Sequence, residues 1–236
     1  MPMPPGTLPR CPEWALGLWQ SRLRYRTQEE LLGVAREYQR RGLPLSVIAV
    51  DFFHWPHLGD WRFDAADWPD PAGMVAELAS MGVRPLVSVW PSVSVVSENY
   101  PHMRDERLLL GTEHGQPFQH VFPDSQVDDK SLPVVFYDPT DERARDYIWS
   151  RIKRNYYDLG FRLWWLDACE PEMYPEQLRQ PALRGGARPG GGQLVSARTC
   201  AGIFRAYAGR RRRRSCQPGA VRLVRQPGLR GGSVVG

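Results

Sequence analysis

Three carboxylates follow one short apolar run and are the side chains best placed to do chemistry. Residues 161–166 read F-R-L-W-W-L, and Asp167, Glu170 and Glu172 come soon after. A strand of this length that closes on an acid is how a parallel α/β barrel presents a catalytic group at its C-terminal face. Two indoles beside a carboxylate also suit a sugar ring, which has apolar C–H faces and hydroxyl edges. The pattern favours a sugar site at Asp167; an acid that only caps a loop is the alternative.

Two further strand ends carry an acid or an aromatic residue. Apolar runs predict strands at residues 15–19, 46–53, 84–90 and 163–166. Asp51 lies near the end of the second run, and Trp90 ends the third. Periodicity alone does not separate a barrel from an open sheet, but acids and a Trp at C-terminal strand ends favour the barrel. For Asp51 the alternative is a loop salt bridge, and for Trp90 it is plain core packing.

Helix-length amphipathic segments alternate with these strands. Thr27 is the expected cap of the first, with Glu30 completing a capping box, while Asp70 opens the second and Thr140 caps the third. The three predicted helices cover residues 27–41, 70–82 and 140–158. Strand–helix alternation of this kind predicts an α/β fold with a parallel sheet and right-handed crossovers.

A long polar segment, residues 92–133, interrupts this alternation. We expect it to be irregular apart from a helical stretch near residues 102–110, and a short strand-like piece follows at 134–138. The segment is longer than an ordinary connection, which favours a functional insertion.

Charge is distributed very unevenly along the chain. Residues 178–236 contain thirteen Arg and twelve Gly but no Lys, Asp or Glu. The other 177 residues therefore hold 18 of the 31 basic residues and all 26 acidic ones. The net charge of +5 comes from this tail, so it supports no nucleic-acid or membrane partner for the rest of the chain.

Several other classes of site find no support. The four Cys form no C-x-x-C pair, the five His lack metal-ligand spacing, and no nucleotide-binding glycine motif follows a strand. We therefore expect neither a metal site nor a cofactor. No apolar run is long enough for a membrane span, and the opening residues lack the apolar core of a secretion signal, so a cytoplasmic location is expected.

Four segments in order resemble glycoside hydrolase family 31, and its α-xylosidase-like branch most closely. They read G-L-W-Q-S-R-L-R-Y at 17–25, V-D-F-F-H-W at 50–55, V-S-V-W-P-S at 87–92 and W-W-L-D-A-C-E-P-E at 164–172. The likeness covers about residues 14–177, the first half of the family's catalytic (β/α)8 barrel. It implies a Pro-rich segment at 1–13, a partial TIM barrel of about four β/α units at 14–177, and a disordered or irregular basic tail at 178–236.

The resemblance implies retaining hydrolysis of an α-linked sugar, an α-xyloside or α-glucoside, by two carboxylates. By motif position Asp167 is similar to the family's nucleophile, Asp51 to an acid that holds sugar hydroxyls, and Trp90 to an aromatic lining the same subsite. Glu170 resembles a residue that helps to position the Asp167 loop. Trp165 stands where several relatives carry Lys, so the charge around the nucleophile differs here.

The tail departs from the family altogether. Reading plausible GC-rich codons one nucleotide out of register turns Arg210–Arg214 into acidic residues and brings back segments typical of the family. We interpret residues 178–236 as the product of a frameshift, which leaves out the family's acid/base residue; the nucleotide sequence of the locus would test this.

Three hypotheses follow. The chain is an α-glycosidase, a catalytically dead fragment of one, or a small basic protein that binds nucleic acid through its Arg-rich tail. A barrel that stops after its fourth strand would leave two unpaired edges, so self-association is also expected.

Overall fold

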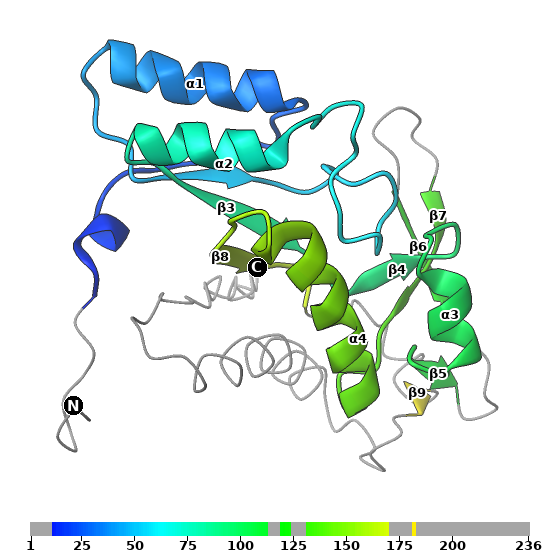
Figure 1. Cartoon of the computed structure of the whole chain (residues 1–236). Helices are drawn as coiled ribbons and strands as arrows, with labels where there is room; N and C mark the ends of the chain where they lie inside the picture. Colours follow the sequence, from blue (N-terminus) through cyan, green and yellow to red (C-terminus); the bar gives the residue numbers. More distant parts are fainter. Residues whose placement is uncertain (1–10, 113–118, 124–130, 170–180, 183–236) are drawn as a thin grey trace, which may run out of the picture.

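The centre of the fold is a parallel sheet of four strands in the order β1-β2-β3-β8 (Figure 1). The computed structural model describes residues 11–112, 119–123, 131–169 and 181–182. The strands are β1 (Trp19–Gln20), β2 (Val47–Val50), β3 (Arg84–Val89) and β8 (Leu163–Leu166). Val50 pairs with Val87, and Val89 pairs with Leu166, both in parallel register. The predicted α/β fold with a parallel sheet is confirmed.

The first predicted strand is largely wrong. A 3-10 helix spans Glu13–Leu16, and β1 covers only Trp19–Gln20. Leu16 is 75% exposed and Leu18 is 46% exposed, so this apolar run is not a buried strand. A short apolar run does not by itself separate strand from helix, because its period is too short to read.

Three helices connect the strands: α1 (Gln28–Arg40), α2 (Pro71–Ser80) and α4 (Glu142–Ile152). Thr27 caps α1 as predicted, its Oγ1 accepting the Glu30 N–H at 3.2 Å. The expected capping box is displaced, because the Glu30 carboxylate accepts from the Arg26 N–H at 2.7 Å rather than from Thr27. Asp70 caps α2 as predicted, by accepting the Gly73 N–H at 2.8 Å.

The predicted cap of α4 is wrong by one residue. Asp141 caps the helix, its Oδ1 accepting the Arg143 N–H at 2.9 Å. Thr140 is engaged elsewhere, because its hydroxyl donates to Asp138 Oδ1 at 2.6 Å. α4 continues into a single π-helical turn, Lys153–Tyr157, directly before β8.

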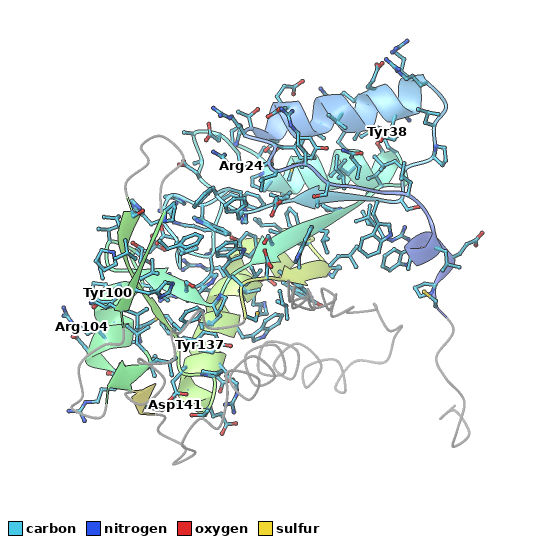
Figure 2. The ribbon with its side chains drawn as sticks, turned by 180° about the vertical axis from the view of Figure 1, so that it is seen from behind. Arg24, Tyr38, Tyr100, Arg104, Tyr137 and Asp141 are labelled. Carbon is cyan, nitrogen blue, oxygen red and sulfur yellow. The ribbon has the colours of Figure 1, made fainter. Side chains whose placement is uncertain are left out.

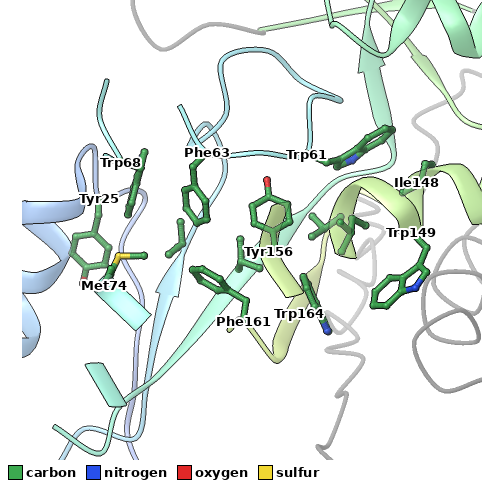
Figure 3. Close-up of a cluster of buried hydrophobic side chains, with 14 of the residues drawn as sticks. Tyr25, Trp61, Phe63, Trp68, Met74, Ile148, Trp149, Tyr156, Phe161 and Trp164 are labelled. Atoms are coloured by element: carbon green, nitrogen blue, oxygen red, sulfur yellow. The ribbon is translucent and has the colours of Figure 1, made fainter. Parts of the chain in front are cut away.

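One face of the sheet packs against all three helices. Its strand residues Ile48, Val50, Val87, Val89 and Trp164 share one core cluster with α1, α2 and α4. Figure 3 shows part of this cluster, with Tyr156 and Phe161 beside Trp164. Ile148 and Ile152 of α4 and Tyr156 of the π-helical turn are buried on this side of the sheet, whereas Arg143 at the start of α4 is exposed.

The segment predicted to be irregular contains ordered structure. β4 (Ser92–Ser94), β7 (Ser131–Phe136) and β6 (Gln119–Pro123) form an antiparallel sheet in that order. The helix here, α3 (Tyr100–Asp105), is shorter than the expected 102–110. We call residues 92–136 the insertion; Figure 2 labels Tyr100 and Arg104 of α3, and Tyr137, which directly follows the insertion. The strand-like piece expected at 134–138 overlaps β7, whereas β4 and β6 are short and rich in polar residues, so the sequence pattern did not reveal them.

Two more short strands pair outside these sheets. β5 (Gly111–Thr112) pairs with β9 (Pro181–Ala182) in antiparallel register. The remainder of the predicted basic tail, 183–236 and 178–180, lies outside the described residues, as do the N-terminal residues 1–10.

Candidate active site

The second face of the parallel sheet carries the candidate site. Side chains alternate between the two faces of a strand, so residues two apart share a face. Val47 and Ala49 of β2 cluster with Leu86 of β3 and Leu163 of β8, on the face opposite the helices. Asp51, Trp90 and Asp167 continue the same alternation just past the C-terminal ends of these three adjacent strands. The structure therefore brings the three predicted residues to one edge and one face of the sheet.

Asp51 lies in a half-buried turn directly after β2. Its Oδ1 accepts the N–H of Phe52 at 2.8 Å, and its backbone carbonyl accepts a hydrogen bond from His54 Nδ1 at 2.8 Å. Burial raises the pKa of the Asp51 carboxyl, and the negative charge of Asp167 raises it further, while the Phe52 N–H opposes both. Asp51 is therefore close enough to Asp167 for the charge of Asp167 to raise the Asp51 pKa.

Asp167 is held by backbone contacts at the end of β8. Its N–H donates to the carbonyl of Val89 at 3.2 Å, which extends the pairing between β3 and β8 by one residue. Cys169 Sγ approaches the Asp167 carbonyl at 3.5 Å. Asp167 is half-buried.

Strained backbone follows both acids. Phe53, two residues after Asp51, has φ of +59°, and Ala168, next to Asp167, has φ of +48°. Left-handed φ in residues other than Gly costs about 1–2 kcal/mol and concentrates at functional sites. Each strand therefore turns sharply just after its acid.

Trp90 stands at the centre of an aromatic cluster, which we define as Phe52, Phe53, Trp55, Trp90 and Phe122. Its ring stacks on Phe52 with centroids 5.4 Å apart and planes 4° apart, and it lies 5.4 Å from Phe122. The Trp90 Nε1–H donates to Ser88 Oγ at 3.2 Å, and its carbonyl accepts from Trp61 Nε1 at 2.9 Å. The first bond fixes the indole against β3, and the second anchors the Trp90 backbone.

Sequence reasoning missed two of these aromatic neighbours. Phe52 was visible in the V-D-F-F-H-W segment, but its contact with Trp90 was not. Phe122 comes from β6 of the insertion and reaches Trp90 only because the antiparallel sheet folds back over the end of β3. Nothing in its local pattern indicated that contact, since β6 was not predicted.

The remaining residues singled out in the sequence are Glu170, Glu172 and Trp165. Glu170 and Glu172 lie outside the described residues, so their predicted roles are not placed. Trp165 is half-buried and packs beside the small cluster on the site's face of the sheet. Across the described residues no three His, Cys, Asp or Glu side chains gather as metal ligands, and no helix is long and apolar enough to cross a membrane.

Acids at the C-terminal ends of parallel strands of one sheet, with helices on the opposite face, are typical of a β/α barrel. Comparison with known families gives the particular one. Residues 8–196 match the family described as the glycosyl hydrolases family 31 TIM-barrel domain. The chain belongs to glycoside hydrolase family 31, and its fold is part of that family's TIM barrel.

Two relatives of known name are also glycosidases. The chain is 49% identical over 167 residues to an uncharacterized family 31 glucosidase of Pseudescherichia vulneris, covering 71% of this chain and 30% of that protein. It is 35% identical over 166 residues to alpha-xylosidase A of Aspergillus niger, covering 70% of this chain and 22% of that protein. The chain thus spans less than a third of the length of these relatives.

A solved structure resembles the fold closely. The family 31 alpha-xylosidase from a soil metagenome, complexed with xylose, superposes with a TM-score of 0.75 at 40% identity. The match covers 84% of this chain and 28% of that one.

Proposed function

We propose that this chain carries the nucleophile side of a retaining α-glycosidase site, with Asp167 as nucleophile and Asp51 as a ligand of sugar hydroxyls. One observation carries the proposal: Asp51, Trp90 and Asp167 end three adjacent parallel strands on a single face. Trp90 and its aromatic neighbours offer the apolar surface that the C–H face of a sugar ring needs. Glu170 retains its proposed role in positioning the Asp167 loop.

The proposed reaction is a double displacement. An Asp167 oxygen attacks the anomeric carbon, the glycosidic C–O bond breaks, and the leaving oxygen takes a proton from a second carboxyl group. Water then attacks the anomeric carbon of the glycosyl-enzyme, gives a proton to the second carboxylate, and releases the Asp167 carboxylate. Retention of the α configuration follows from the two inversions.

The sugar we propose is α-linked xylose. Two observations support this choice over glucose: a relative 35% identical is named an alpha-xylosidase, and a 40% identical structure is an alpha-xylosidase complexed with xylose. An α-glucoside is the alternative substrate, because the Pseudescherichia relative is named a glucosidase.

Covalent trapping tests the nucleophile directly. In 5-fluoro-α-D-xylosyl fluoride the leaving group is fluoride, so departure needs little help from a general acid, and the ring fluorine slows hydrolysis of the intermediate. We expect one glycosyl unit to add to the protein and to map to the peptide containing Asp167. Asp167→Asn should abolish labelling, whereas Asp105→Asn, at an exposed site on α3, should label like the wild type. Labelling of another carboxylate, or none in the wild type, would contradict the proposal.

The second carboxyl group sets a separate expectation. Residues 178–236 contain no Asp or Glu, so a general acid would have to come from residues 1–177. The resemblance gives Asp51 and Glu170 in that part other roles. A general acid contributes about 10²- to 10⁴-fold in rate. We therefore propose that hydrolysis of aryl α-xylosides and α-glucosides by this chain stays at the level of a no-enzyme control. Turnover that disappears in Asp167→Asn would show that an acid is present after all.

Self-association through the β1 and β8 edges of the parallel sheet is a further part of the proposal. Light scattering coupled to size-exclusion chromatography measures it, and a mass equal to one chain across all concentrations would rule it out.

A further inference from the structure

A buried side-chain pair joins the turn after β2 to the turn before β8. His54 is 1% exposed and Tyr156 is 0% exposed. His54 Nε2 lies 2.9 Å from the Tyr156 hydroxyl, and His54 Nδ1 lies 2.8 Å from the Asp51 carbonyl oxygen. Neither residue has a role in the proposed reaction, although one is three residues from Asp51 and the other precedes the strand that ends at Asp167.

The partners of His54 fix its tautomer. A carbonyl oxygen can only accept, so Nδ1 must carry a hydrogen and donate to Asp51. In a neutral ring Nε2 is then the acceptor, and the Tyr156 hydroxyl donates to it. Burial lowers the pKa of His54 to about 4, so the ring is neutral at pH 7. Burial also raises the pKa of Tyr156, which keeps its hydroxyl protonated.

The ring of His54 is fixed on its faces as well. It packs against Trp55 at 4.6 Å and Phe63 at 5.0 Å between centroids. The His54 carbonyl accepts the N–H of Asp64 at 2.8 Å, which anchors its backbone. The imidazole therefore has little freedom to rotate away from the Asp51 carbonyl.

The same π-helical turn holds the loop after β2 at a second point. Asn155, next to Tyr156, donates from Nδ2 to the carbonyl of Trp61 at 3.0 Å. Trp61 in turn donates from Nε1 to the carbonyl of Trp90 at 2.9 Å. In Figure 3 the Tyr156 hydroxyl points toward the loop that carries Phe63 and Trp61. Single π-helical turns occur often at functional sites, where they re-aim side chains.

We propose that His54 and Tyr156 are positioning residues for the sugar ligand Asp51. The proposal rests on the proposed function. Tyr156 orients the imidazole, and the Nδ1–H of His54 sets the Asp51 carbonyl and with it the direction of the Asp51 carboxylate toward the sugar. Neither side chain touches substrate in this arrangement.

Removing the Tyr156 hydroxyl is the first test. Tyr156→Phe leaves Nε2 of His54 buried without its donor, so the ring is free to change tautomer and to release the Asp51 carbonyl. We expect the second-order rate constant for labelling by 5-fluoro-α-D-xylosyl fluoride to fall about tenfold, a change of about 1.4 kcal/mol. The matched control is Tyr38→Phe on α1 (Figure 2), which removes a 2.8 Å hydrogen bond from the Tyr38 hydroxyl to Gln20 of β1. The control should label within about twofold of the wild type.

Two His54 variants separate positioning from packing. His54→Asn has a side-chain N–H that can replace the Nδ1 donor, whereas His54→Leu fills similar space with no donor. We expect His54→Asn to recover part of the labelling rate that His54→Leu loses, with both measured on folded protein as judged by near-ultraviolet circular dichroism. A residue that only packs would give the opposite order, because Leu retains more apolar contact than Asn.

Nitrogen-15 NMR of the wild-type imidazole gives a readout that does not depend on sugar. A hydrogen on Nδ1 is expected, and a hydrogen on Nε2 would overturn the proposal. Equal labelling of Tyr156→Phe and the wild type would overturn it too, while leaving Asp167 as the nucleophile. No labelling of the wild type would instead contradict the proposed function, so the two failures are distinguishable.

Discussion

The parallel sheet and strand β6 of the insertion differ in how deeply their residues are buried. β2 is buried at all four positions, because helices cover one face and a second cluster covers the other. β6 of the insertion is never fully buried, and Val121 within it is 67% exposed. The acids belong to the buried unit, where neighbouring strands set their positions. The insertion adds Val93 and Val135 to the same core cluster as the helices, and its Phe122 contacts Trp90 at the site.

The boundary between these two regions is tightly packed. Trp55 and Leu58, from the loop after β2, form one buried cluster with Val134 of β7. The backbone of Ser94 in β4 donates to the carbonyl of Leu58 at 2.8 Å. The insertion is therefore attached to the parallel sheet by the same loop that begins at Asp51. Substitutions at this boundary should therefore alter the position of Asp51.

Core truncation should show the largest contrast between the regions. Leu78 of α2 is 0% exposed, so Leu78→Ala should lower the free energy of unfolding by about 2–5 kcal/mol. Val121→Ala in the insertion should change it by about 0.5 kcal/mol or less. Urea unfolding followed by circular dichroism measures both. Equal losses would mean that β6 is packed as tightly as α2.

A pair of glycine substitutions tests the boundary. Gly59 has φ of +93°, and a Cβ there would lie 2.7 Å from the Cα of Val93. Gly59→Ala should therefore destabilise the protein by roughly 2–4 kcal/mol, from backbone strain and overpacking together. Gly33→Ala is the matched control, because a Cβ there meets nothing within 4 Å inside helix α1. It should stabilise by about 0.5–1 kcal/mol, and a destabilising Gly33→Ala would contradict this account.

Acid should weaken the protein through His54. Its pKa is about 4 when folded against an ordinary 6.5, so between those values the unfolded chain binds more protons. The contribution of the neutral His54 ring to the free energy of unfolding is complete above about pH 6.5. It falls as the pH drops toward 4, by roughly 3 kcal/mol in all. The raised carboxyl pKa values of Asp51 and Asp60 act in the opposite direction. The difference between wild type and His54→Asn isolates the His54 contribution, and a difference independent of pH would contradict the assignment.

A surface ion pair between two helices of the parallel unit should matter least. Arg36 of α1 contacts Glu77 of α2 at 2.6 Å, and both side chains are exposed. Glu77→Gln should lower the free energy of unfolding by less than about 1 kcal/mol. The loss should shrink further in 1 M salt, since exposed charges are screened there. A loss as large as that of Leu78→Ala would show that charge rather than packing joins these helices.

Sequence reasoning worked best where a pattern is local. The strand at Ser46 onward and the caps at Thr27 and Asp70 were visible because apolar runs and helix caps depend on neighbouring residues. It failed at the helix start of α4, where Thr140 and Asp141 are both good caps. Only the contact with Asp138 decides between them. It also missed β4 and β6 of the insertion, which are short and rich in polar residues.

The amino-acid sequence by itself determined which strands end in Asp51, Trp90 and Asp167, and its ordered segments determined the family. Only the tertiary structure decided that these three share a face, that Phe122 reaches Trp90, and that Tyr156 orients His54 from 102 residues away. The physical reason is the range of the interactions involved. Apolar runs and caps are fixed by adjacent residues, whereas face sharing and side-chain pairs depend on strand register and helix packing, which arise only when distant segments meet.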